Sequence, residues 1–270
     1  MNSTRVPQIL GRRTRALALI IGAVVTWELS GRLFQLRTDL LPTPSRISLE
    51  IWKEWPQLSA HARVTCGEIA GGFFLAALLA VPLAFTAAMF PGLDRLVEPI
   101  LACPRHLPLV AAAPVLLIWF GFGTLSKVLL VSLLSFFPIA SGTAEGLHSV
   151  PLEVQDLLHT MGATRWQEFL KVRLPACLPD LFKGLKAAAT PAVVGAIVGE
   201  IVAADKGLGY LLLAAHNKLN SPLLFAALVC LSFAAPLLIG AIRVVEREVI
   251  PWYQVKQSCV SEASQQKQPR

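Results

Sequence analysis

Long apolar blocks separated by polar segments are the feature that most limits what this sequence can fold into. Six stretches carry few or no charged side chains, at 15–34, 69–90, 99–120, 128–144, 187–204 and 223–242. A helix needs roughly 20 apolar residues to cross the hydrocarbon core of a bilayer. A soluble core would have to bury several helices that are apolar all round, which a small domain rarely does. The pattern therefore predicts an all-α membrane protein with about six transmembrane helices.

The positions of the Lys and Arg residues orient these spans. If the N-terminus is cytoplasmic, the cytoplasmic segments hold most of the Lys and Arg residues between and beside the spans, as the positive-inside rule requires. We therefore expect both termini, and the polar segment 150–175, in the cytoplasm. The net charge of +7 comes from scattered basic residues. No dense basic run indicates a nucleic-acid partner.

Composition changes along the chain divide it into five segments. We expect a cytoplasmic tail at 1–14, the first span and the start of an outer loop at 15–40, and an outer amphipathic segment at 41–62. A core transmembrane domain at 63–248 contains a hairpin at 150–175, and a tail at 249–270, rich in Gln, Ser and Lys, is predicted to be cytoplasmic and disordered. In the outer segment Ile47, Ile51 and Trp55 recur at helical spacing. They predict either a helix at the membrane interface or a solvated loop helix.

The first half of segment 150–175 has the pattern of a short amphipathic helix. Its apolar residues follow the spacing i, i+3, i+4, i+7 and so share one face: Val154, Leu157, Leu158 and Met161. Gly162 then occupies the position where a helix C-terminus favours a left-handed residue. The sequence therefore predicts that a first helix ends at Gly162.

The second half opens with a capping-box pattern, in which Thr164 is followed three residues later by Gln167. It predicts a second short helix over 165–172 that stops near Leu174-Pro175. The charged residues Arg165, Glu168 and Lys171 are expected at the surface together with Trp166. An exposed Trp among charges is typical of a protein contact. The alternative is a loop helix that packs on the membrane domain and has no further role.

The same segment resembles the cytoplasmic signature loop of binding-protein-dependent ABC importer permeases, which reads E-A-A-x3-G-x9-I-x-L-P. The matching residues, in order, are Asp156, Leu157, Leu158, Gly162, Val172, Leu174 and Pro175. Asp replaces Glu, and two leucines replace the alanines, without changing the register. The segments 108–128, 135–147 and 199–212 are also similar to the branch that imports sulfonates, taurine, nitrate or bicarbonate, and thiamine precursors.

This resemblance implies the transmembrane domain of a type I ABC importer in the bacterial inner membrane. It implies a second copy of the chain as dimer partner, a separate ABC ATPase subunit that binds ATP and Mg, and an external binding protein that delivers a small polar solute. The ATPase-coupling residues that it implies are Asp156, Leu157, Leu158, Met161, Gly162, Ala163, Thr164, Arg165, Trp166, Leu174 and Pro175. Each hairpin is expected to lie in a groove of the ATPase subunit.

The sequence lacks residue patterns typical of phosphate binding, metal binding or catalysis. It contains no GxxxxGK[ST] phosphate-binding loop. Its five histidines are scattered, and none forms H-E-x-x-H. The five cysteines include no CxxC pair, so they are interpreted as small buried residues rather than as disulfides or metal ligands. We therefore expect no catalytic residues, metal or cofactor in this chain.

Ionisable residues inside apolar spans are costly and call for an explanation. Arg105 either extends to the headgroups or offers a counter-charge to the solute, and Glu200 either faces the translocation path or pairs with a cation of a neighbouring helix. Trp119 and Phe137 are further candidates for the path, although aromatic residues in spans also serve as packing or interfacial residues.

Two other function classes remain open from the sequence. A membrane-embedded assembly or signalling protein could use the hairpin to dock a different cytosolic partner. A secondary transporter is the other class, but such carriers usually contain internal repeats, and none is evident here. The dependence of transport on ATP separates these classes.

Overall fold

The computed structural model describes residues 6–33, 41–90, 92–93, 109–203 and 205–252, and this part of the chain is helical without any strand. The elements run in chain order as α1 (Val6–Leu33), α2 (Pro44–Lys53), α3 (Trp55–Met89), the 3₁₀ turn η2 (Leu109–Ala112), α5 (Ala113–Phe120), α6 (Thr124–Leu147), α7 (Leu152–Thr160), α8 (Arg165–Glu168), the π turn η3 (Phe169–Arg173), α9 (Leu174–Ala203), α10 (Leu208–Asn217), α11 (Ser221–Ser232) and α12 (Ala234–Val249). The predicted all-α fold is confirmed.

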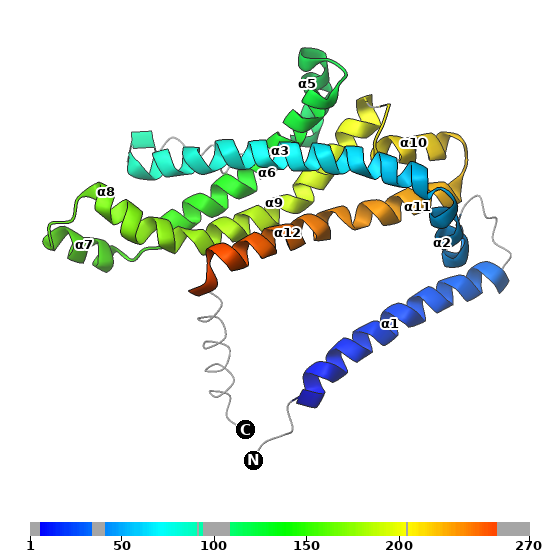
Figure 1. Ribbon diagram of the computed structural model, residues 1–270, viewed down its shortest axis with the longest axis horizontal. Coiled ribbons are helices and arrows are strands. Elements are labelled where there is room, and N and C mark those ends of the chain that lie inside the picture. The colour runs from blue at the N-terminus through cyan, green and yellow to red at the C-terminus, as the bar shows by residue number, and fades with distance from the viewer. Residues whose placement is uncertain (1–5, 34–40, 91, 94–108, 204, 253–270) are drawn as a thin grey trace.

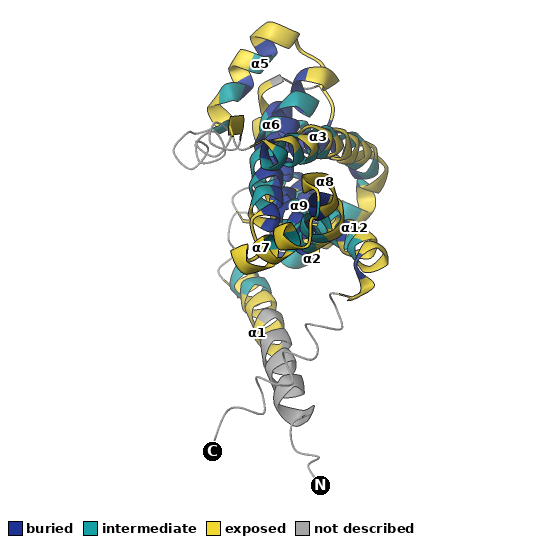
Figure 2. Cartoon of the chain, turned by 90° about the vertical axis from the view of Figure 1, so that its left-hand side faces the viewer, coloured by how far each residue is buried: buried dark blue, intermediate teal, exposed yellow. Residues whose placement is uncertain are grey.

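The long helices α3, α6 and α9 form the body of the molecule (Figure 1), and their facing surfaces hold most of its buried residues (Figure 2). Helices α6 and α9 approach each other closely at the glycines Gly142 and Gly184. A Cβ added to Gly142 would lie 2.7 Å from Cα of Gly184. Small residues allow this approach, which provides dispersion contacts where lipid removes the hydrophobic drive for association.

Four helical stretches of the described chain are long and apolar enough to cross a membrane. They are Trp55–Met89, Thr124–Leu147, Arg165–Val202 and Ser221–Val249. They contain the predicted fourth and sixth spans and cover all but the last one or two residues of the second and fifth. The predicted first span lies in α1, a helix of 28 residues whose side chains are described only in part. Residues 99–108 of the predicted third span lie outside the described residues, and the other half of that span forms a shorter apolar helix at Leu109–Phe120.

The predicted last span, 223–242, is not one uninterrupted helix. Helix α11 ends at Ser232 and α12 begins at Ala234, with Phe233 between them. Pro236 explains the break, because its ring would collide with the carbonyl of Ser232 in a continuous α-helix and it has no N–H to donate.

The predicted amphipathic segment is divided between two helices, α2 and the start of α3. Ile47 of α2 is buried, and Ile51 packs against a buried cluster of α3, α9, α10 and α11. Trp55 does not share this helix, contrary to the expectation: α2 ends at Lys53, and Trp55 begins α3 with its side chain exposed. Pro56 explains the new start, since proline is favoured in the first turn of a helix.

Helix α1 lies apart from the body over most of its length and meets it near its C-terminal end (Figure 1). There Glu28 Oε2 accepts a hydrogen bond from the backbone N–H of Ser45 at 3.0 Å. The rings of Trp27 and Phe225 lie 6.2 Å apart. These contacts join α1 to α2 and α11.

Candidate functional site

Helices α7 and α8 form a hairpin at one end of the long helices, and they extend beyond the body of the molecule (Figure 1). Helix α7 begins after Pro151, which serves as its N-cap, and it ends at Thr160. None of its residues is buried within this chain. Helix α7 is therefore at the surface of this chain.

The turn of the hairpin is a Schellman motif centred on Gly162. The N–H of Gly162 donates to His159 O at 3.0 Å, and the N–H of Ala163 donates to Leu158 O at 3.0 Å. Gly162 adopts φ +77°, in the left-handed region, where residues with a Cβ are disfavoured. The predicted end of the first helix at Gly162 is confirmed.

A capping box begins α8, as the sequence predicts. The N–H of Gln167 donates to Thr164 Oγ1 at 3.3 Å, and the N–H of Thr164 donates to Gln167 Oε1 at 2.9 Å. Two N–H groups that the first helical turn leaves without partners are thereby satisfied. The turn and the cap fix both sides of the hairpin by local hydrogen bonds.

The prediction that the second helix stops near Leu174-Pro175 is wrong. Helix α8 passes through the π turn η3 directly into α9, so the chain stays helical from Arg165 to Ala203. Pro175 explains the π turn, because its ring would collide with the carbonyl of Lys171 in a regular α-helix. Widening the helix by one residue relieves this conflict, and the N–H of Leu174 donates to Phe169 O.

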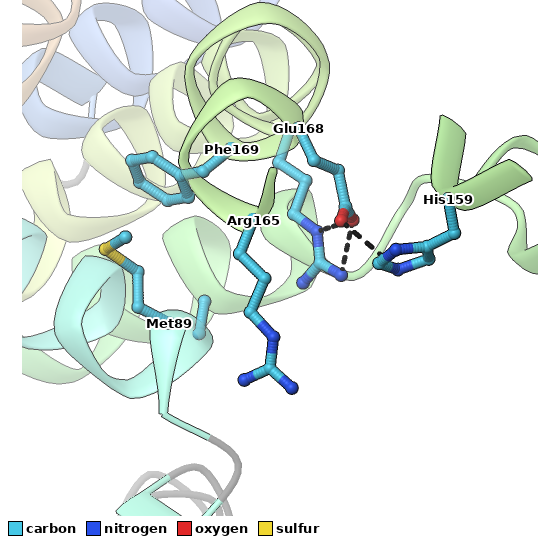
Figure 3. Close-up of a pocket in the computed structure, with 7 residues that line it drawn as sticks. Met89, His159, Arg165, Glu168 and Phe169 are labelled. Carbon is cyan, nitrogen blue, oxygen red and sulfur yellow. Dashed lines mark hydrogen bonds and ion pairs between the residues drawn. The ribbon is translucent and has the colours of Figure 1, made fainter. Parts of the chain in front are cut away.

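A polar network around the buried Glu168 joins the two arms of the hairpin (Figure 3). Glu168 Oε1 accepts a hydrogen bond from Arg173 Nε at 2.7 Å, and Arg173 Nη2 donates to Gln155 Oε1 on α7 at 2.9 Å. His159 Nε2, also on α7, lies 3.6 Å from Glu168 Oε2. The expectation that Glu168 lies at the surface is wrong: its side chain is 4% exposed because it pairs with Arg173.

The hairpin is anchored to the body through aromatic contacts. Trp166 stacks on Phe169 with ring centroids 6.1 Å apart, and Phe169 meets Phe85 of α3 edge-on at 5.7 Å. A cavity of about 220 Å³ lies beside this contact, between the end of α3 and the hairpin (Figure 3). Its lining consists of Ala88, Met89, His159, Arg165, Glu168, Phe169 and Arg173.

Apolar side chains on the hairpin face away from the body. Met161 is 75% exposed, Leu157 59% and Trp166 56%, and Asp156 and Arg165 are exposed beside them. In the predicted apolar face of α7, Leu158 is half-buried, whereas Val154, Leu157 and Met161 are exposed. This face is therefore mostly exposed to solvent. An exposed apolar patch with a polar rim is typical of a protein-binding surface. Leu174 and Pro175 lie beyond the hairpin, inside the continuous helix.

The residues predicted for a translocation path do not converge in the described part of the chain. Glu200 is 1% exposed and is bonded to Thr65 and Gly209, so it faces the protein interior. Trp119 on α5 is 74% exposed, and Phe137 on α6 contacts the neighbouring Phe136 ring at 5.3 Å. Arg105 lies outside the described residues.

The described residues contain no group of three or more His, Cys, Asp or Glu side chains that could hold a metal ion. The free thiols described are those of Cys66, Cys177 and Cys230. The hairpin offers a rigid, partly apolar surface. Its geometry is suited to binding another protein.

Comparison with known sequences decides what kind of protein carries this hairpin. Residues 72–250 match the family described as binding-protein-dependent transport system inner membrane component. The chain belongs to this family. The predicted identity as a permease subunit of a binding-protein-dependent ABC importer is thereby confirmed.

Individual permeases resemble this chain over most of its length. It is 34% identical to the formylaminopyrimidine transport permease protein ThiX of Halalkalibacterium halodurans over 85% of this chain and 92% of the relative. It is 34% identical to the riboflavin transport system permease protein RibX of Chloroflexus aurantiacus, over 85% and 86%. A putative aliphatic sulfonates transport permease protein, SsuC of Bacillus subtilis, is 28% identical over 87% and 86%.

The fold of this permease is also that of a solved transporter structure. An inward-facing MetNI methionine ABC transporter structure superimposes with a TM-score of 0.61, covering 73% of this chain and 98% of that chain at 22% identity. This similarity confirms the predicted fold of an ABC importer transmembrane domain.

Proposed function

We propose that this permease forms the path of a small polar solute across the bacterial inner membrane and is driven through its 150–175 hairpin by a separate ABC ATPase subunit. The observation that carries this proposal is the rigid hairpin with outward-facing apolar residues. Leu157, Met161 and Trp166 are exposed, although the turn and the cap beside them are fully hydrogen-bonded. A partner protein that covers these side chains would remove them from water, which is worth up to about 1.5–3 kcal/mol for each fully buried residue.

The helix that follows the hairpin supports the same proposal. Because Arg165–Ala203 is continuous, a displacement of the hairpin is transmitted along α9 into the centre of the body. Helix α9 packs against both α3 and α6. A flexible loop in place of η3 would absorb the displacement instead.

The family implies which partners this chain assembles with, and we include them in the proposal. A second copy of this chain completes the path, and an external binding protein delivers the solute. ATP and Mg bind to the ATPase subunit and not to this chain. Both termini lie in the cytoplasm, on the same side as the hairpin, in agreement with the distribution of Lys and Arg.

The relatives narrow the class of solute. The two relatives cited at 34% identity are named for a formylaminopyrimidine and for riboflavin, and one at 28% for aliphatic sulfonates. We therefore place a heterocyclic, thiamine-precursor-like solute before a sulfonate, nitrate or bicarbonate. Glu200 carries no weight in this choice, because its carboxylate is satisfied inside the protein.

Co-purification with the ATPase subunit tests the proposal. Met161→Asp and Leu157→Asp place a charge in the apolar face of the hairpin and should reduce recovery of the ATPase subunit by roughly tenfold or more. Leu219→Asp is the matched control, since Leu219 is 76% exposed in the turn between α10 and α11. If the hairpin variants retain the ATPase subunit as the control does, the hairpin is not the docking surface.

A further inference from the structure

Side chains of two long helices hold the start of α10 by three successive backbone N–H groups. The N–H of Gly207 donates to His61 Nδ1 at 3.0 Å, that of Leu208 to Thr65 Oγ1 at 2.8 Å, and that of Gly209 to Glu200 Oε2 at 2.6 Å. The first N–H groups of a helix have no partner within the helix. We call His61, Thr65 and Glu200 the α10 clamp, because together they supply these partners.

Glu200 is the centre of the α10 clamp. Its Oε1 accepts a hydrogen bond from the hydroxyl of Thr65 at 2.6 Å, so both carboxylate oxygens are occupied. Glu200 is 1% exposed, and Thr65 is fully buried. One buried carboxylate on α9 thus joins α3 directly and α10 through its first turn.

A buried ion pair lies in the same region. Lys127 of α6 forms it with Glu68 of α3, and both side chains are buried. The Glu200 side chain faces the N-terminus of α10, which carries a partial positive charge of about half a unit. The α10 clamp and the ion pair therefore connect α3, α6, α9 and α10 at one place.

The backbone of α10 comes so close to Glu200 that only glycine fits. Gly207 has φ +118°, and a Cβ added to it would collide with the Glu200 carboxyl group. A Cβ on Gly209 would lie 2.9 Å from Glu200 Oε2. Any side chain at these two positions would push α10 away from α9.

The position of the α10 clamp along α9 gives it a function. The continuous helix Arg165–Val202 has 38 residues, which corresponds to a length of about 57 Å at ~1.5 Å per residue. The hairpin lies at one end of this helix and α10 lies toward the other (Figure 1). Glu200 is therefore far from the proposed ATPase contact and next to the loop that leads to α10.

We propose that Glu200 is a positioning residue that transmits movement of the hairpin to α10 at the opposite end of the permease. This inference rests on the proposed function. With the α10 clamp closed, α9 and α10 move as one body with α3. With the clamp open, ATP hydrolysis continues but does not move the far end of the path, so the permease becomes uncoupled.

A matched pair of substitutions at Thr65 tests this inference. Thr65→Val keeps the shape of the side chain but removes the hydroxyl that links Leu208 to Glu200, whereas Thr65→Ser keeps the hydroxyl. The permease is reconstituted with its ATPase subunit and binding protein, and solute uptake and ATP hydrolysis are measured together. We expect Thr65→Val to lower the solute transported per ATP on the order of tenfold or more and Thr65→Ser to stay within about twofold of the wild type.

A second pair of substitutions tests the α10 clamp at the backbone of its glycine. Gly207→Ala adds the Cβ that collides with Glu200, and Gly67→Ala on α3 adds one that meets nothing within 4 Å. Gly207→Ala should reduce transport per ATP as Thr65→Val does, while the amount of bound ATPase subunit stays at the wild-type level. Gly67→Ala should change neither.

The outcomes separate this inference from the proposed function. If the wild type does not bind an ATPase subunit, the proposed function fails. If it binds the subunit and both Thr65→Val and Gly207→Ala transport as much solute per ATP as the wild type, the role of Glu200 is refuted. Loss of transport with a matching loss of bound ATPase subunit would also refute it, because the substitutions would then act on assembly and not on transmission.

Discussion

Replacing Gly162 changes the backbone energy of the hairpin without changing its packing. Gly162 has φ +77°, and a Cβ built on it meets nothing within 4 Å. The left-handed conformation costs an L-residue roughly 1–2 kcal/mol. For a β-branched residue the cost lies at or above the upper end of this range, because such residues rarely adopt the left-handed conformation. Since 1.4 kcal/mol is a factor of ten, Gly162→Val should weaken binding of the ATPase subunit by roughly ten- to thirtyfold.

The assay is the affinity of the purified permease for its ATPase subunit, measured for a graded series at Gly162. Gly162→Asn should bind almost as the wild type does, because Asn tolerates the left-handed region. Gly162→Ala should be intermediate and Gly162→Val weakest. Gly123→Val is the control, since Gly123 has an extended backbone and its added Cβ also faces open space. Equal affinities for the Asn and Val variants would refute the argument that the turn conformation controls docking.

Two further substitutions test the packing. Glu168→Ala removes the buried partner of Arg173. It should lower the hydrogen-exchange protection of α7 by roughly ten- to hundredfold, which corresponds to about 1–3 kcal/mol. Unchanged protection would mean that the network does not hold the hairpin arms together. Gly142→Val should destabilise the purified permease to heat by about 1–3 kcal/mol, because its Cβ would lie 2.7 Å from the backbone of α9. Gly67→Val should leave the stability to heat unchanged, because a Cβ at Gly67 meets nothing within 4 Å. Equal melting temperatures of the two variants would contradict close packing of α6 on α9.

Features set by neighbouring residues were predictable from the sequence. The end of α7 at Gly162 depends on one residue that accepts φ +77°, and the start of α8 depends on the Thr164–Gln167 capping box. Each motif lies within at most six consecutive residues, Leu158–Ala163 for the turn and Thr164–Gln167 for the cap, so their hydrogen bonds are fixed by the local chain. The apolar spans were predictable for a related reason, since lipid requires an unbroken run of apolar residues to form a helix.

Features set by distant residues were not predictable. Glu168 looks like a surface residue in the sequence, but Gln155 on the other arm of the hairpin helps bury it through Arg173. Glu200 meets Thr65 across a separation of 135 residues. No local pattern encodes such a pairing, because it depends on how α3 and α9 pack.

The effect of a proline on a helix was not predictable either. The sequence predicts that a helix stops near Leu174-Pro175, whereas a π turn accommodates Pro175 and the helix continues. Next to Pro236, in contrast, the helix breaks between α11 and α12. The outcome depends on whether neighbouring helices stabilise the continued direction of the chain, which the sequence around the proline does not specify.

The most direct test of the central claim is the energy source for uptake. The permease is reconstituted in vesicles with its ATPase subunit and binding protein, and solute uptake is followed with ATP present or removed, and with an ion gradient present or collapsed. We predict that uptake requires ATP, is insensitive to the ion gradient and is lost in Met161→Asp. Uptake that follows an ion gradient in ATP-depleted vesicles would contradict the account.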